Sequence, residues 1–167
     1  MKIKLSGIVS ESIVDGPGIR YTVFVQGCPH NCEGCHNPQT HSFSGGYDSD
    51  TDKILTEIIE NPLLDGATFS GGEPFCQAKA LADLARKLKE NKLGVIAYSG
   101  YTFEYLLEHA NEENGYLELL QGIDYLIDGK FILALKSYEC KFRGSTNQRI
   151  INVSESLKER RAVIAEL

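Results

Sequence analysis

The stretch that decides the fold is a strand-like segment that runs into a cysteine-rich loop: Tyr21-Thr22-Val23-Phe24-Val25-Gln26-Gly27-Cys28-Pro29-His30-Asn31-Cys32-Glu33-Gly34-Cys35-His36. The first five residues are all β-branched or aromatic and predict a buried strand. Three cysteines follow in residues 27–36, hereafter the cysteine loop. Iron–sulfur clusters are ordinarily held by four thiolates, so a set of three leaves one iron open to another ligand. Such an open position is typical of a catalytic metal site.

A structural zinc site is the competing interpretation of the cysteine loop. Zinc would take the three thiolates and one imidazole to complete four ligands. Three histidines are near enough in sequence to supply that imidazole: His30, His36 or His41. The cysteine spacing alone favours neither zinc nor an iron–sulfur cluster.

Composition narrows the class of protein. The 167 residues are 42% hydrophobic and 24% charged, the ordinary mixture of a globular protein, and we expect one domain over residues 1–167. The net charge of −6, without a basic block, argues against a nucleic-acid partner. No apolar run approaches the roughly 20 residues of a membrane span, and no secretory signal is apparent, so we expect no membrane association. Five cysteines, three of them in one loop, predict a cytoplasmic protein rather than a disulfide framework.

Strand and helix patterns alternate along the chain. Strands are expected near residues 21–26, 67–70, 93–98, 125–127 and 149–153. Helices are expected near residues 51–61, 77–91 and 154–164, and a further helix is expected to begin at residue 102. The first helix would be capped by Asp50 or Thr51, the third by Thr102 and the last by Ser154. Alternation of this kind predicts parallel βαβ units, and about six strands are too few for a closed eight-stranded barrel. We therefore predict an α/β fold, an open partial (β/α)6-type barrel with parallel strands.

Unusual residues follow four of the predicted strands at their carboxyl ends. They are the cysteine loop after Gln26, Gly71-Gly72-Glu73-Pro74 after Ser70, Ser99-Gly100 after Tyr98, and Asp128 after Ile127. Parallel α/β folds build their ligand sites at that edge. A structural zinc site would not require these four segments to meet at one edge, whereas an active site would.

The segment Gly71-Gly72-Glu73-Pro74 has two interpretations. It can be an ordinary turn, in which glycines supply positive φ angles and proline begins the next helix. It can also let the main chain approach a ligand, with carbonyl oxygens and the Glu73 carboxylate facing a ligand ammonium group. Its combination with the cysteine loop favours the second interpretation.

Together these motifs resemble a known family. Cys-x3-Cys-x2-Cys followed by Gly-Gly-Glu-Pro is similar to the radical S-adenosylmethionine superfamily, and Asp15-Gly16-Pro17-Gly18-Ile19-Arg20 resembles its glycyl-radical-enzyme activases. Residues 35–38, 128–131 and 142–149 are most similar to the activases of anaerobic (class III) ribonucleoside-triphosphate reductases. The resemblance covers residues 6–152. Gly34 departs from the superfamily, since many members carry an aromatic residue there that packs near the cofactor adenine.

The resemblance implies a radical SAM fold and a [4Fe-4S] cluster held by Cys28, Cys32 and Cys35, with S-adenosyl-L-methionine on the fourth iron. It implies that reductive cleavage of this cofactor yields a 5′-deoxyadenosyl radical, which abstracts hydrogen from a glycine of the anaerobic ribonucleoside-triphosphate reductase catalytic subunit. A flavodoxin or ferredoxin-type protein would donate the electron. The cofactor contacts implied are Gly34 and His36 beside the cluster, Gly71, Gly72 and Glu73 at the ammonium group, Asp128 and Lys130 at the ribose or carboxylate, and Ser99 as a further candidate.

Several residues and functions stay open. Cys76 and Cys140 are expected to be small buried apolar residues rather than ligands. Arg143, Asn147 and Gln148 form either a solvated loop or a segment that contacts cofactor or partner. The alternative functions are a zinc-binding interaction module, an activase of the pyruvate formate-lyase type, and a radical enzyme that acts on a small molecule, such as one making a carboxy-deazaguanine from a pterin. The last would require additional charged pocket residues and a magnesium site, neither of which we identify in the sequence.

Overall fold

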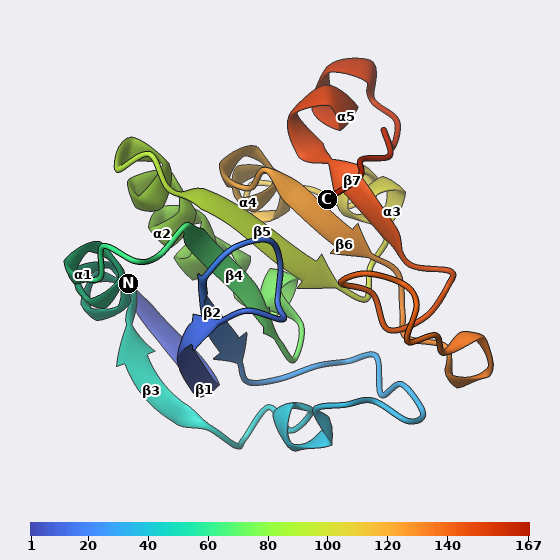
Figure 1. Cartoon of the computed structure of the whole chain (residues 1–167), viewed down its shortest axis with the longest axis horizontal. Coiled ribbons are helices and arrows are strands. Elements are labelled where there is room, and N and C mark those ends of the chain that lie inside the picture. Colours follow the sequence, from blue (N-terminus) through green and yellow to red (C-terminus); the bar gives the residue numbers. More distant parts are fainter.

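A seven-stranded sheet in the order β3-β1-β2-β4-β5-β6-β7 forms the centre of the computed structural model, which describes residues 1–167 (Figure 1). The strands are β1 (Lys2–Ser12), β2 (Arg20–Val25), β3 (Tyr47–Asp50), β4 (Gly66–Gly71), β5 (Gly94–Ser99), β6 (Tyr125–Asp128) and β7 (Arg149–Asn152). Strands β2, β4, β5 and β6 run parallel to one another. Strands β1, β3 and β7 are antiparallel to their neighbours and extend the sheet on both sides.

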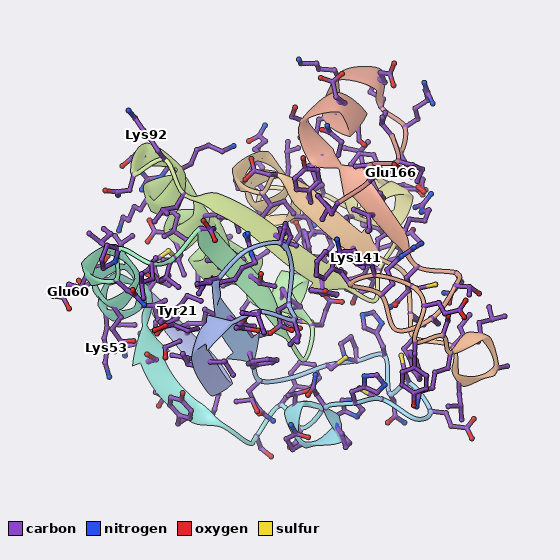
Figure 2. The ribbon with its side chains drawn as sticks, viewed as in Figure 1. Tyr21, Lys53, Glu60, Lys92, Lys141 and Glu166 are labelled. Carbon is purple, nitrogen blue, oxygen red and sulfur yellow. The ribbon has the colours of Figure 1, made fainter.

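Most of the helices cover one face of this sheet, behind it in the view of Figure 1, whereas the last helix stands beyond the upper end of β7. The helices are α1 (Thr51–Glu60), α2 (Ala78–Glu90), α3 (Phe103–Glu108), α4 (Tyr116–Gly122) and α5 (Val153–Glu159), with short 3-10 helices η1 (Pro38–Thr40), η2 (Pro74–Gln77) and η3 (Leu133–Leu135). The main core is a cluster of 27 buried apolar residues from the sheet and these helices. Figure 2 shows Lys53 and Glu60 projecting outward from α1, and both are exposed.

The opposite face of the sheet carries a much smaller apolar cluster. Ile96, Ile127 and Ile150 form it, and the C-terminal residues Ala165 and Leu167 pack against it. Successive residues of a strand point to opposite faces, so Val95 and Ala97 lie in the main core while Ile96 lies here. Because no helix layer covers this face, room remains on it for a cavity.

The predicted α/β class with parallel strands is confirmed. Two of the predicted helix caps are also confirmed. The Asp50 carboxylate accepts a hydrogen bond from the Asp52 amide at the start of α1, and the Thr102 hydroxyl accepts one from the Tyr105 amide at the start of α3. Both signals are local, because the capping side chain and the amide it binds lie within one turn.

The closing helix is shorter than predicted. It begins at Val153, and the side chain of Asn152, rather than that of Ser154, caps it by accepting from the Glu155 amide. Arg160 adopts a left-handed conformation and ends the helix, so residues 162–164 lie beyond it. Ile164 instead forms an isolated bridge with Ile151 of β7. Tertiary pairing with β7 thus prevails over the apolar pattern of residues 162–164.

The parallel part of the sheet has four strands, fewer than the six units expected. The sequence patterns did not predict the strands β1 and β3, the helix α4 or the antiparallel direction of β7. Strand β1 does show a readable alternation, because Ile3 and Leu5 are buried between less buried neighbours. Strand β3 is polar throughout, with the sequence Tyr-Asp-Ser-Asp, and pairs with β1 through its backbone. A strand of that composition carries no apolar signal that a sequence pattern could detect.

Candidate functional site

A cavity of about 660 Å³ opens where the parallel strands end. Its lining includes Cys28, Cys32, Cys35, Gly71, Gly72 and Ser99. The cysteine loop and the β6–β7 loop lie along the same edge of the sheet in Figure 1, in light blue and orange, and both contribute to the cavity wall. The predicted meeting of the cysteine loop, the Gly-Gly turn and the end of β5 at one site is thus present in the structure.

The cysteine loop is held in place by backbone hydrogen bonds to the segment that follows it. The amide of Gly27 donates to the carbonyl of Thr40 at 2.6 Å, and the amide of Cys28 donates to the carbonyl of His41 at 3.1 Å. Within the loop, the amide of Asn37 donates to the Cys35 sulfur at 3.4 Å. This contact fixes the position of the Cys35 side chain within the loop.

The donor set of the loop fits an iron–sulfur cluster. All three thiols are free, partly buried and exposed to the same cavity. Burial raises the pKa of the Cys28 thiol, and the nearby Glu73 carboxylate raises it further. Metal ligation requires the thiolate, so cluster insertion would release the Cys28 proton. No three His, Cys, Asp or Glu side chains gather closely enough to hold one metal ion.

Glu73 is the centre of a buried hydrogen-bond network. Its side chain is 0% exposed, and its Oε1 accepts from the His30 ring at 2.6 Å, from the Ser99 hydroxyl at 2.9 Å and from the Gly100 amide at 2.8 Å. Its Oε2 accepts from the Phe75 amide at 2.9 Å. We call these five residues the Glu73 clasp. They join the cysteine loop, the turn after β4 and the end of β5.

The Glu73 clasp corrects three expectations. The Glu73 carboxylate is enclosed by protein donors, so it is not the group that faces a ligand ammonium. Ser99 lines the cavity, but its hydroxyl donates to Glu73. The Nε2 of His30 is occupied by the same carboxylate, and its side chain is only 5% exposed. A zinc site that uses this nitrogen of His30 is therefore disfavoured.

Gly71 and Gly72 are required by close packing between backbones. Gly71 has a φ of +98°, and a Cβ added there would lie 2.5 Å from the amide nitrogen of Val25. A Cβ added to Gly72 would overlap the carbonyl oxygen of Gly27, directly before Cys28. The carbonyl of Gly72 accepts no hydrogen bond from the protein, and Gly72 lines the cavity. The turn therefore supports the cysteine loop and leaves one backbone acceptor available at the cavity.

Substituting Gly72 with valine is expected to abolish S-adenosylmethionine binding and also to lower cluster retention. The side chain would push against the Gly27 carbonyl and displace the first ligand, Cys28. Iron and sulfide assays, followed by spectroscopic titration of the reduced protein with the cofactor, measure both effects. Gly7→Val is the matched control, because nothing lies within 4 Å of a Cβ added to Gly7. Wild-type cofactor affinity in the Gly72→Val protein would contradict the prediction.

Asp128 and Lys130 do not contribute to the cavity. Asp128 is 1% exposed, and its carboxylate accepts from the Phe103 amide at 2.7 Å and from the Arg149 Nε at 3.0 Å. Lys130 is exposed and lies outside the cavity lining. The antiparallel pairing of β6 with β7 sets Asp128 opposite Arg149. The cofactor contact expected for Asp128 and Lys130 stays a prediction.

The other predicted residues are divided between the cavity and the surface. His36 lines the cavity, with its ring centroid 5.3 Å from that of Phe131. Gly34 is exposed and outside the lining, and a Cβ added to it would lie 2.9 Å from Leu133 Cδ1. Cys76 is exposed rather than buried. The lack of a side chain at Gly34 therefore accommodates the β6–β7 loop.

Several cavity residues are not singled out by the sequence as cofactor contacts. They are Tyr98, Phe131, Tyr138 and Cys140, together with Arg143 and Gln148, for which two interpretations were open. Tyr98 could have been found, because it stands at the carboxyl end of a predicted strand. The others lie in the irregular segment between β6 and β7, where no periodic pattern indicates which residues point inward. Asn147 lies outside the cavity lining.

Comparisons with known proteins agree with this site. A family model described as a 4Fe-4S single cluster domain matches residues 14–151. The anaerobic ribonucleoside-triphosphate reductase-activating protein of Vibrio cholerae is 35% identical over 146 residues, which cover 83% of this chain and 90% of that protein. The chain belongs to the family of anaerobic ribonucleoside-triphosphate reductase-activating proteins. The match to this relative extends over most of both chains.

Two further proteins are similar to this member of the activating-protein family. The pyruvate formate-lyase-activating enzyme of Clostridium pasteurianum is 37% identical over 117 residues, which are 65% of this chain and 49% of that enzyme. The crystal structure of QueE from Escherichia coli has a TM-score of 0.48 at 18% identity and covers 61% of this chain and 54% of that chain. The 4Fe-4S family match confirms the expected iron–sulfur cluster over zinc, and its ligation by Cys28, Cys32 and Cys35 stays a prediction. Within this activating protein, no helix has both the length and the apolar character that crossing a bilayer requires.

Proposed function

We propose that this protein is a radical S-adenosylmethionine activase that generates a glycyl radical on the catalytic subunit of an anaerobic ribonucleoside-triphosphate reductase. The observation that carries the proposal is the lining of one cavity by Cys28, Cys32 and Cys35 beside the Gly71–Gly72 turn, at the carboxyl edge of four parallel strands. Residues 1–167 act as a single domain. A flavodoxin or ferredoxin-type protein supplies the electron.

Each part of the cavity has a defined task in this function. The three loop cysteines hold a [4Fe-4S] cluster, and the free carbonyl of Gly72 accepts a hydrogen bond from the methionyl ammonium of S-adenosylmethionine. When both are bound, the cluster would pass one electron to S-adenosylmethionine and cleave it to methionine and a 5′-deoxyadenosyl radical. The Glu73 clasp keeps the cysteine loop and the Gly71–Gly72 turn at a constant separation. That rigidity matters because productive geometry tolerates little displacement.

The mouth of the cavity suits a polypeptide substrate. Val14 and Tyr138 both line the cavity, although their exposed fractions are 72% and 90%. Large apolar or aromatic side chains that project into solvent around a cavity are typical of protein interaction sites. A glycine-bearing segment of the partner could thus rest on this rim while its Cα–H enters the cavity.

A reconstitution experiment tests the proposed function. Cluster-loaded protein is mixed anaerobically with a reductant, S-adenosylmethionine and the reductase. We expect 5′-deoxyadenosine, measured by chromatography, and an organic radical on the reductase, measured by electron paramagnetic resonance. Replacing the radical-site glycine of the reductase with alanine should remove the radical signal, because alanine does not form the same backbone-stabilised radical. Absence of 5′-deoxyadenosine with every partner would overturn the assignment to this reaction class.

Activation of a pyruvate formate-lyase is the second candidate function. The 37% identity to the activating enzyme of Clostridium pasteurianum favours it, although the matched segment is only 49% of that enzyme. The same assay with a pyruvate formate-lyase in place of the reductase distinguishes the two. A radical on the lyase alone would keep the reaction class and overturn the choice of partner.

A further inference from the structure

A row of four aromatic rings leads from the cysteine loop to the surface of the protein. His30 stands in the loop between its first two cysteines, and its ring centroid is 4.5 Å from that of Tyr101. The Tyr101 ring stacks on the Tyr105 ring at 4.6 Å, with 3° between the two planes. The Tyr105 ring stacks in turn on the His109 ring at 3.9 Å. We call these four side chains the aromatic row.

The two ends of the aromatic row differ in exposure. His30 lines the cavity, and its side chain is only 5% exposed. At the other end, Tyr105 is 38% exposed and His109 is exposed as well. Neither these two residues nor Tyr101 belong to the cavity lining. The aromatic row thus connects the wall of the cavity with a surface that lies outside the cavity.

Local sequence and hydrogen bonds hold the rings in this arrangement. Tyr101, Tyr105 and His109 are spaced four residues apart along the segment that contains α3, so they share one side of it. The Nδ1 of His109 lies 2.9 Å from the carbonyl oxygen of Tyr105. At the buried end, the His30 ring is held by the Glu73 carboxylate at 2.6 Å. The row is therefore fixed at both of its ends.

The proposed function requires an electron route that stays open while the cavity is occupied. S-adenosylmethionine and the glycine segment of the reductase would fill the cavity and cover its mouth, so a protein donor has to approach the cluster from another side. Electron tunnelling slows steeply as the gaps between bonded groups lengthen, and closely stacked rings keep those gaps short. The exposed rings of Tyr105 and His109 also present flat π faces, on which a planar flavin can stack.

We propose that the aromatic row is the route by which an electron enters the cluster, and that Tyr105 and His109 form the contact for the flavin of a reduced flavodoxin. This inference rests on the proposed function and names the electron path to that same site. The reduced flavin loses one electron, and the oxidised cluster gains that electron. No bond forms or breaks and no proton is transferred. The four rings keep their oxidation state, because they only shorten the gaps that the electron crosses.

The rate of cluster reduction tests this route. Cluster-loaded wild-type and Tyr105→Ala proteins are mixed anaerobically with increasing concentrations of reduced flavodoxin. The electron paramagnetic resonance signal of the reduced cluster is then measured in rapidly frozen samples. We expect Tyr105→Ala to lower the limiting rate of cluster reduction and to weaken the apparent affinity for flavodoxin by roughly 2- to 10-fold, the range for the loss of one aromatic pair. Tyr105→Phe keeps the ring and should behave as the wild type.

A substitution inside the aromatic row separates the electron route from the contact with the donor. Tyr101→Leu interrupts the row and leaves the exposed rings of Tyr105 and His109 in place. It should therefore lower the limiting rate of cluster reduction and leave the apparent affinity for flavodoxin unchanged. Tyr47→Ala is the matched control, because it removes a tyrosine of β3 that is 47% exposed and lies outside the row. Its reduction should proceed as in the wild type.

Dithionite, a small reductant that enters the open cavity directly, separates a local effect from a general one. It should reduce the cluster of every variant at the wild-type rate, and iron and sulfide content should be unchanged. The inference is wrong if flavodoxin does not reduce the wild type, if it reduces Tyr105→Ala and Tyr101→Leu as fast as the wild type, or if dithionite is slowed to the same extent. The proposed function still stands in these cases when the dithionite-reduced wild type forms 5′-deoxyadenosine. If it forms none, the proposed function fails and the inference fails with it.

Discussion

Replacing Cys32 with alanine is expected to remove the iron–sulfur cluster and, with it, all formation of 5′-deoxyadenosine. The three loop cysteines line one cavity, and a cluster that already has one iron without a thiolate cannot lose a second thiolate and remain anchored. Cys28→Ala and Cys35→Ala should behave in the same way. Iron and sulfide assays after anaerobic reconstitution, together with the visible absorption of the cluster, measure the loss.

Two cysteines outside the cysteine loop serve as matched controls. Cys76 lies in η2 and is exposed, and Cys140 lies in the β6–β7 loop, where it lines the same cavity. Alanine at either position should leave the iron and sulfide content at the wild-type level. Cys140 is the more demanding control, since its thiol shares the cavity with the cluster ligands. Full cluster content in Cys32→Ala, or a cluster lost in Cys76→Ala, would refute the ligand assignment.

Replacing Glu73 with alanine is expected to lower the free energy of unfolding substantially, because each buried donor left without an acceptor costs about 1–3 kcal/mol. The substitution leaves the His30 ring, the Ser99 hydroxyl and the amide of Gly100 without their shared acceptor. Denaturant unfolding of the protein before cluster insertion measures this loss without a contribution from iron. After reconstitution, the same variant should bind S-adenosylmethionine weakly, because the cysteine loop is no longer held against the Gly71–Gly72 turn.

Conservative and distant variants make the Glu73 prediction specific. Glu73→Gln keeps the shape and one oxygen acceptor, so its loss of stability should be smaller than that of Glu73→Ala. Glu112 is exposed and forms no side-chain hydrogen bond, and Glu112→Ala should change stability by no more than about 0.5 kcal/mol. Equal stability of Glu73→Ala and Glu112→Ala would mean that the Glu73 clasp does not hold the site together.

The sequence by itself determined the features that depend on neighbouring residues. Spacing within the cysteine loop indicates a metal site with an open position, and apolar periodicity locates α1 and α2 to within a few residues. The caps at Asp50 and Thr102 are readable because each side chain bonds to an amide two or three residues ahead. The edge that holds the site is readable as well, because the carboxyl ends of parallel strands meet on one side of a sheet.

Only the tertiary structure decided which polar side chains face the cavity. Glu73 points inward because donors from two other loops enclose its carboxylate. Asp128 is hydrogen-bonded to Arg149 because β7 runs antiparallel to β6. Arg143 reaches the cavity because an irregular loop is held to β5 by the Tyr98 hydroxyl. Each of these partners is distant in the chain, and a single sequence contains the residue types but not the long-range pairings that satisfy a buried charge or leave one free for a ligand.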